Sequence, residues 1–127
     1  MEIAASGIAA RFGRISVLEG VDFAMRAGEM VGLIGPNGSG KTTLLRILAN
    51  LRAPEGGEVR YGGRSAGTIG RQALAREIAY LAQGGNVHWQ MRAEAVVALG
   101  RLPHRRPFQG LDRTDREAIE QALAGRR

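Results

Sequence analysis

Residues 35–42 could do chemistry, because they match the pattern G-x-x-x-x-G-K-[ST] at every defined position. Glycines allow tight turns and a close approach to a ligand, so the amides of such a loop can cradle an anion. A lysine adds a mobile charge for the β- and γ-phosphates, and a threonine hydroxyl can bind Mg²⁺. The pattern therefore predicts a site for ATP and Mg²⁺ at Gly35, Pro36, Asn37, Gly38, Ser39, Gly40, Lys41 and Thr42, followed by Thr43.

Lys41 is the only lysine of the chain, whose other 17 basic residues are arginines. Arginine is a poor substitute where a compact point charge is needed. The alternative is a glycine-rich turn with no ligand. The flanking segments favour phosphate binding, because the apolar run Met30–Ile34 precedes the loop and an amphipathic helix at 41–51 follows it.

These elements belong to an α/β pattern that begins with an antiparallel portion. Period-2 and short apolar runs predict strands at residues 2–10, Val17–Met25, Met30–Ile34, Glu58–Tyr61 and Ile78–Leu81. Helical spacing predicts helices at residues 41–51, Arg71–Arg76 and Arg92–Leu99, and a last helix that begins with a capping box from Thr114 to Glu117.

The stretch Gly35–Leu45, GPNGSGKTTLL, resembles the Walker A segment of ABC-transporter ATPases. Phe12 matches the position where that family stacks an aromatic ring on adenine, and a core side chain is the alternative. Ile78–Gln83, IAYLAQ, resembles the strand that leads into the family's glutamine loop. The resemblance implies that Gln83 contacts Mg²⁺ or the attacking water, so Lys41 and Gln83 are the candidate catalytic residues.

A narrower resemblance lies in Val96–His104, which is similar to the ATPases of importers for iron-siderophores, haem and cobalamin. Trp89 and Met91 then lie where that group places residues that face its membrane partner. His88 and Trp89 are candidates for contact with a coupling helix of that partner, and an ordinary surface loop is the alternative for both. Gln90, Glu94 and Ala95 depart from the group's pattern. The resemblance implies an energy-coupling ATPase subunit, peripheral on the cytoplasmic face of the membrane, with permease subunits and a second ATP-binding subunit as partners.

Three features of the complete family are absent from the 127 residues: an LSGGQ-like signature, an apolar strand that ends in Asp-Glu, and the switch histidine. We therefore expect one partial domain over 1–127, with a P-loop core portion at 1–83 and the start of a helical subdomain at 84–127. The implied fold is a P-loop NTPase of the ABC type, with an antiparallel portion and a parallel core sheet, incomplete on its C-terminal side. Hydrolysis by this chain alone should be very slow, and its stability should be marginal.

Composition limits the other function classes. The chain has no cysteine, so disulfides and thiolate metal sites are excluded, and no apolar run approaches the about 20 residues of a membrane span. Its net charge of +6 comes mostly from the second half, around Arg101, Arg105 and Arg106, where a solvated basic loop is favoured over contact with anionic lipid.

Two other functions remain open: a nucleotide-binding remnant without turnover, and a soluble ABC ATPase that acts on nucleic acid. The LGRLPH stretch argues against nucleic acid as a partner.

Overall fold

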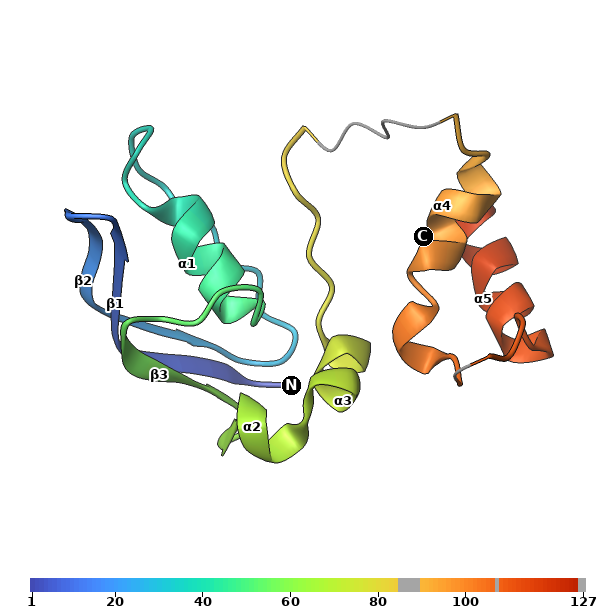
Figure 1. The fold of residues 1–127 in the computed structure, drawn as a ribbon, viewed down its shortest axis with the longest axis horizontal. Helices are drawn as coiled ribbons and strands as arrows, with labels where there is room; N and C mark the ends of the chain where they lie inside the picture. Colours follow the sequence, from blue (N-terminus) through green and yellow to red (C-terminus); the bar gives the residue numbers. More distant parts are fainter. Residues whose placement is uncertain (85–89, 107, 126–127) are drawn as a thin grey trace. The chain divides into compact units, whose positions relative to one another are not determined.

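The computed structural model describes residues 1–84, 90–106 and 108–125 (Figure 1). The chain divides into two compact units, Met1–Tyr80 and Leu81–Arg127. The loop that matches the phosphate-binding pattern lies in the first unit.

The first unit contains a four-stranded antiparallel sheet with the order β2-β1-β3-β4. Its strands are β1 (Ile3–Phe12), β2 (Ile15–Met25), β3 (Gly56–Tyr61) and β4 (Arg64–Ser65). The strands predicted at residues 2–10, Val17–Met25 and Glu58–Tyr61 are confirmed as β1, β2 and β3, with ends that differ by a few residues. β1 lies between β2 and β3 and forms a hairpin with β2. Phe12 is the last residue of β1, beside the turn of this hairpin.

A β-bulge in β1 sets which side chains of the sheet are buried. The register shifts between Ala5 and Ile8, where Gly7 has a φ of 61°. One extra residue in a strand exchanges its two faces. Ala5, Ile8 and Ala10 are all buried as a result. In a strand with strict alternation, Ala5 would lie on the opposite face from Ile8 and Ala10.

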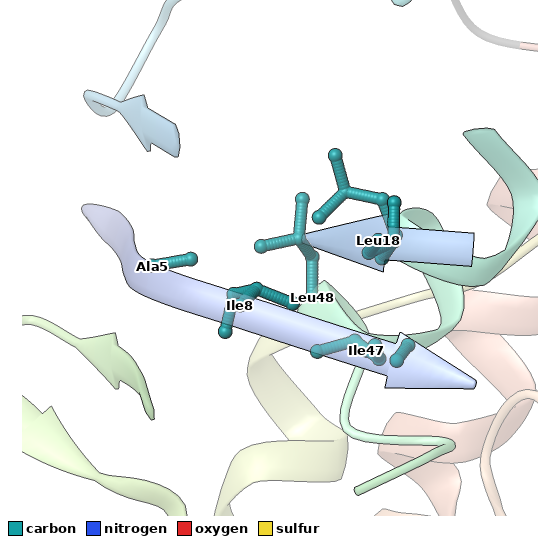
Figure 2. Packing of buried hydrophobic residues seen from close by; sticks show 7 residues of the cluster. Ala5, Ile8, Leu18, Ile47 and Leu48 are labelled. Atoms are coloured by element: carbon teal, nitrogen blue, oxygen red, sulfur yellow. The ribbon is translucent and has the colours of Figure 1, made fainter. Parts of the chain in front are cut away.

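The core of the first unit forms where one helix, α1 (Lys41–Leu48), packs on β1 and β2. Figure 2 shows Ala5 and Ile8 of β1 and Leu18 of β2 close to Ile47 and Leu48 of the helix. Small alanines on β1 leave room for the helix. The buried cluster is Ala5, Ile8, Ala10, Leu18, Leu44, Ile47 and Leu48.

The helix ends earlier than the sequence predicted. Asn50 adopts a left-handed conformation with a φ of 56°. Its amide donates to the Ile47 carbonyl at 2.9 Å, and the Leu51 amide donates to the Arg46 carbonyl at 2.8 Å. These two bonds form the Schellman motif that closes helices at a left-handed residue. The helix predicted at 41–51 therefore ends at Leu48, and Leu51 lies beyond it with an exposed side chain.

A hydrogen bond from Tyr61 connects the C-terminal end of α1 to the sheet. The Tyr61 side chain, on β3, is fully buried, and its hydroxyl donates a hydrogen bond of 3.0 Å to the Leu48 carbonyl. Burial raises the pKa of the Tyr61 phenol. The carbonyl at the C-terminal end of the helix is thus satisfied from the sheet.

The strands predicted at Met30–Ile34 and Ile78–Leu81 were wrong, because neither segment pairs with another strand in the described residues. Met30 and Ile34 are each 99% exposed, and Leu81 is 96% exposed. An apolar run predicts burial, but a strand also needs a neighbour that accepts and donates its backbone hydrogen bonds.

Apolar cavities flank the first of these segments. One of about 200 Å³ is lined by Val31, Leu33, Ile78 and Tyr80 together with residues of β1, β2 and α1. A second, of about 310 Å³, is lined by Leu33 and Ile34 together with the glycine-rich loop. The segment that leads into the loop is therefore incompletely packed.

Two short helices follow β4 in the first unit, α2 (Ala66–Ile69) and α3 (Arg71–Glu77). The Ser65 hydroxyl caps α2 by accepting from the Thr68 amide at 3.3 Å. The helix predicted at Arg71–Arg76 is confirmed as α3, and its Leu74 is buried.

The second unit contains α4 (Ala93–Leu99), the 3-10 turn η1 (Leu102–His104) and α5 (Arg113–Leu123). Both predicted helices of this region are present. The predicted capping box at Thr114–Glu117 was wrong, because Asp112 is the N-cap and Asp115 is its partner. Asp115 is the buried carboxylate of this unit, whereas Thr114 and Glu117 are exposed.

Candidate phosphate-binding site

The glycine-rich loop, residues 35–40, joins the unpaired Met30–Ile34 segment to α1. A hydrogen bond of 3.3 Å from the Ser39 amide to the Pro36 carbonyl closes its turn. Gly38 has a φ of 85° and Gly40 a φ of 86°. Such left-handed angles favour glycine, so the sequence pattern and the backbone geometry agree at both positions.

Gly40 lies against β2. A Cβ atom at this position would lie 2.7 Å from the Leu18 Cδ2 and 3.0 Å from the Val17 carbonyl oxygen. Gly40 is also the N-cap of α1. The close approach to β2 therefore fixes where the helix begins, and so where its first amides are presented.

The first turn of α1 is suited to an anion. No side chain caps it, and its first turn contains no acidic residue. The amides of Lys41, Thr42 and Thr43 occupy the first three positions, which have no carbonyl partner within a helix. The positive end of the helix dipole adds to these donors.

Lys41 extends its ammonium group into the loop. Its Nζ donates to the Gly35 carbonyl at 2.7 Å, to the Pro36 carbonyl at 2.6 Å and to the Ser39 hydroxyl at 3.4 Å. The charge is thereby held at the centre of residues 35–40. A phosphate oxygen is a stronger acceptor for this ammonium than a neutral carbonyl.

The two threonines differ in exposure. Thr42 is exposed, whereas Thr43 is buried, with 7% of the residue exposed. An exposed hydroxyl beside the loop fits the expected Mg²⁺ contact of Thr42. The roles of both threonines, and of Asn37, stay predictions.

Phe12 stands at the end of β1, opposite Ile15 in the β1–β2 hairpin. It is 56% exposed, so it is not the core side chain of the alternative interpretation. The guanidinium of Arg52 lies 4.3 Å from the centroid of its ring. Sequence reasoning missed Arg52, because no local pattern shows that residues 40 positions apart meet.

The other predicted site residues lie in the second unit or outside the described residues. Gln83 is exposed, and its role stays a prediction. Met91 is exposed just before α4. His88 and Trp89 lie outside the described residues.

The basic region of the second unit is partly engaged in internal contacts. Arg101 Nε lies 2.8 Å from Asp115 Oδ1, in a pair whose carboxylate is buried. Arg105 donates to the Gln109 carbonyl at 2.6 Å. A purely solvated loop is therefore too simple a description for Arg101 and Arg105, whereas Arg106 is exposed.

Residues 1–84, 90–106 and 108–125 contain no group of three or more His, Asp or Glu side chains placed to hold a metal ion. None of the helices described is both long enough and apolar enough to cross a membrane.

Comparison with known proteins identifies what the chain is similar to. Residues 18–125 match the family described as ABC transporter. A hemin import ATP-binding protein of Pseudomonas entomophila is 39% identical, over 93% of this chain and 45% of its own length. A cobalamin import ATP-binding protein of Halobacterium salinarum is 34% identical, over 98% of this chain and 31% of its own length. A probable siderophore transport system ATP-binding protein of Bacillus subtilis is 34% identical, over 88% of this chain and 41% of its own length. The chain thus spans less than half the length of these relatives.

Solved structures show the same fold. An ATP-binding subunit of an ABC transporter superposes with a TM-score of 0.73 at 26% identity, covering 92% of this chain and 46% of the solved one. A dimeric bacterial ABC transporter cassette gives a TM-score of 0.74 at 25% identity, covering 96% of this chain and 54% of the solved one. The antiparallel sheet and its helices are therefore part of an ABC-type ATP-binding fold.

Proposed function

The chain belongs to the ABC transporter family, and from that premise we propose that it binds MgATP as part of the energy-coupling subunit of an importer. The cargo class that we propose is an iron-siderophore, haem or cobalamin. Relatives with these import functions are 34–39% identical to the chain. The Val96–His104 stretch supports the same group from the sequence.

The observation that carries the proposal is the geometry of residues 35–43. Two glycines with positive φ, an uncapped helix start without acidic residues and the Lys41 ammonium converge on one loop. These donors fit a chain of phosphates, which offers several anionic oxygens at short spacing. Gly35, Pro36, Asn37, Gly38, Ser39 and Gly40 would surround the phosphates, and Lys41 would exchange its loop carbonyls for phosphate oxygens.

Thr42 and Gln83 are the residues that we propose to contact Mg²⁺ through a hydroxyl and a side-chain amide. The bound Mg²⁺ would supply positive charge that neutralises the phosphate oxygens. Phe12 would offer its exposed ring face to the adenine. Each of these groups acts on ATP by holding or orienting it.

The proposed partners follow from the relatives and not from the geometry. The proteins similar to this chain are import ATP-binding subunits, and one similar solved structure is dimeric. We propose membrane-spanning permease subunits and a second ATP-binding subunit as partners, with the protein peripheral on the cytoplasmic face of the membrane. Nucleic acid is not proposed as a partner.

The first test is the exchange of Lys41 for alanine. Lys41→Ala should weaken MgATP binding by about 10-fold or more, because a charge-assisted contact to phosphate contributes about 1.5–3 kcal/mol. Isothermal titration calorimetry measures the affinity. Arg46→Ala, which removes an exposed cation from the same helix, is the matched control and should bind as the unchanged chain does. Equal affinities of Lys41→Ala and the unchanged chain would refute the proposal.

Turnover is a separate question from binding. Within its 127 residues the chain has neither an LSGGQ-like motif nor an apolar strand that ends in Asp-Glu. We therefore propose that this chain by itself binds ATP and hydrolyses it very slowly. Steady-state release of inorganic phosphate by the purified chain measures this, and a rate of several per second would contradict it.

A further inference from the structure

Arg52 contacts the end of β1 that carries Phe12. Its guanidinium lies over the Phe12 ring at 4.3 Å from the centroid. A guanidinium at this distance is attracted to the negative face of an aromatic ring. One face of the ring is thus covered by a cation, while 56% of the residue stays exposed.

The guanidinium is itself held by two hydrogen bonds, both donated by one of its nitrogens. Its Nη2 donates to the Arg11 carbonyl at 2.6 Å and to Glu55 Oε1 at 3.0 Å. The other carboxylate oxygen of Glu55 accepts from the Arg11 amide at 3.0 Å. Arg52, Glu55 and the backbone of Arg11 therefore form a closed ring of hydrogen bonds immediately before Phe12, and only 22% of the Arg52 side chain is exposed.

A short path of neighbouring residues connects these hydrogen bonds to the loop at residues 35–40. Ala10 pairs with Leu18 across the β1–β2 hairpin, and Gly40 lies against Leu18. Phe12 is two residues beyond Ala10, which is about 7 Å along a strand. The ring of Phe12 and the start of α1 thus belong to one neighbourhood of the first unit.

We propose that Arg52 is a positioning residue for the nucleotide base: it holds the Phe12 ring in one orientation and leaves a single ring face for stacking. The inference rests on the proposed binding of ATP and adds a residue to it. A side chain that is already ordered loses less conformational entropy when a ligand stacks on it. Arg52 acts through Phe12 and need not touch the nucleotide.

The test compares two ligands that share phosphates and differ in the base. MgATP should engage both Phe12 and the phosphate-binding loop, whereas inorganic tripolyphosphate should engage the loop alone. Arg52→Ala should weaken MgATP binding about 3- to 10-fold and leave tripolyphosphate binding unchanged. The matched control is Arg60→Ala, because Arg60 forms an ion pair of 2.8 Å with Glu58 on β3 of the same unit. It should change neither affinity.

Two further variants separate positioning from a general loss of structure. In a Phe12→Ala background, Arg52→Ala should have no further effect on MgATP affinity, because no ring remains to be oriented. Arg52→Lys should lie between Arg52→Ala and the unchanged chain, since an ammonium keeps a positive charge near the ring but lacks the planar guanidinium that lies over its face. Circular dichroism of each variant reports whether the chain is folded.

The outcomes distinguish this inference from the proposed function. Equal losses for MgATP and tripolyphosphate in Arg52→Ala, or an undiminished loss in the Phe12→Ala background, would overturn the positioning role while ATP binding stands. Unchanged MgATP affinity in Arg52→Ala would do the same. Failure of the unchanged chain to bind either ligand would overturn the proposed function, and with it this inference.

Discussion

Gly40 shows how one residue serves both the packing and the site. Its φ of 86° lies in the left-handed region, and its missing side chain lets β2 approach within contact of the loop. Gly38 has nearly the same φ but open space around it, since no atom beyond its chain neighbours lies within 4 Å of a Cβ built there. The two glycines of one motif therefore meet different demands, conformational at Gly38 and both conformational and steric at Gly40.

Gly40→Ala should consequently destabilise the chain more than Gly38→Ala. Both variants carry the cost of a left-handed alanine, about 1–3 kcal/mol. Gly40→Ala adds an overlap with Leu18 and the Val17 carbonyl, so its free energy of unfolding should be lower than that of Gly38→Ala. Urea unfolding followed by circular dichroism measures both values. Equal values would show that β2 moves away from the loop at no cost.

At the scale of elements, the second unit depends on a carboxylate shared by two segments. Asp115, at the start of α5, accepts from Arg101 Nε at 2.8 Å, and Asp112 donates its amide to the second Asp115 oxygen at 3.3 Å. Asp112 in turn accepts from the Asp115 amide at 2.8 Å. The hydrogen bond from Arg101 is the main cause that lowers the pKa of Asp115 below its ordinary value, and burial opposes it. The charged carboxylate thus joins the end of α4 to the start of α5.

A lowered pKa makes this contribution depend on pH. Above the ordinary aspartate pKa of 3.8, Asp115 is charged in both the folded and the unfolded chain, and its stabilisation is fully present. It is lost as the pH falls from there through the lower pKa of the folded state. The difference in urea midpoint between the unchanged chain and Asp115→Asn should therefore be constant near neutral pH and shrink below about pH 4.

The control for this measurement is Glu117→Gln. Glu117 forms an exposed ion pair of 3.2 Å with Arg113 on the same helix. Exposed pairs of this kind contribute little, because water and salt screen them. The variant should match the unchanged chain at every pH. A pH-independent effect of Asp115→Asn would instead point to a loss of packing.

At the scale of the whole molecule, the main feature is apolar surface that the described chain does not cover. Met30, Ile34 and Leu81 are almost fully exposed, and cavities lie beside the Met30–Ile34 segment. The relatives to which the chain is similar are more than twice as long. Exposed apolar segments of this kind favour association between molecules, so we expect the isolated chain to aggregate readily.

Substitution of exposed and buried apolar residues should separate solubility from stability. Met30→Ser should change the free energy of unfolding by less than about 0.5 kcal/mol, because its side chain is already in water, and it should slow aggregation. Ile47→Ala removes a fully buried side chain and should cost about 2–5 kcal/mol. Urea unfolding and light scattering measure the two quantities. A large loss of stability in Met30→Ser would mean that the segment is packed in solution.

The sequence by itself determined the family, the position of the glycine-rich loop before α1, and most of the helices and strands. These follow from local information: residue types at fixed spacing for Gly35–Thr42, and hydrophobic periodicity for β1, α3 or α5. Even the wrong capping box at Thr114 was displaced by only two residues, because Asp112 and Asp115 repeat the same spacing.

Only the tertiary structure decided which apolar runs find a partner and which distant side chains meet. Met30–Ile34 and Ile78–Leu81 have strand-like sequences, yet a strand exists only where a neighbour completes its hydrogen bonds. Arg52 reaches Phe12 because β1 and the turn after α1 are brought together by a core of Ala5, Ile8 and Ile47. Contacts between residues 40 positions apart depend on the packing of whole elements, which no local pattern encodes.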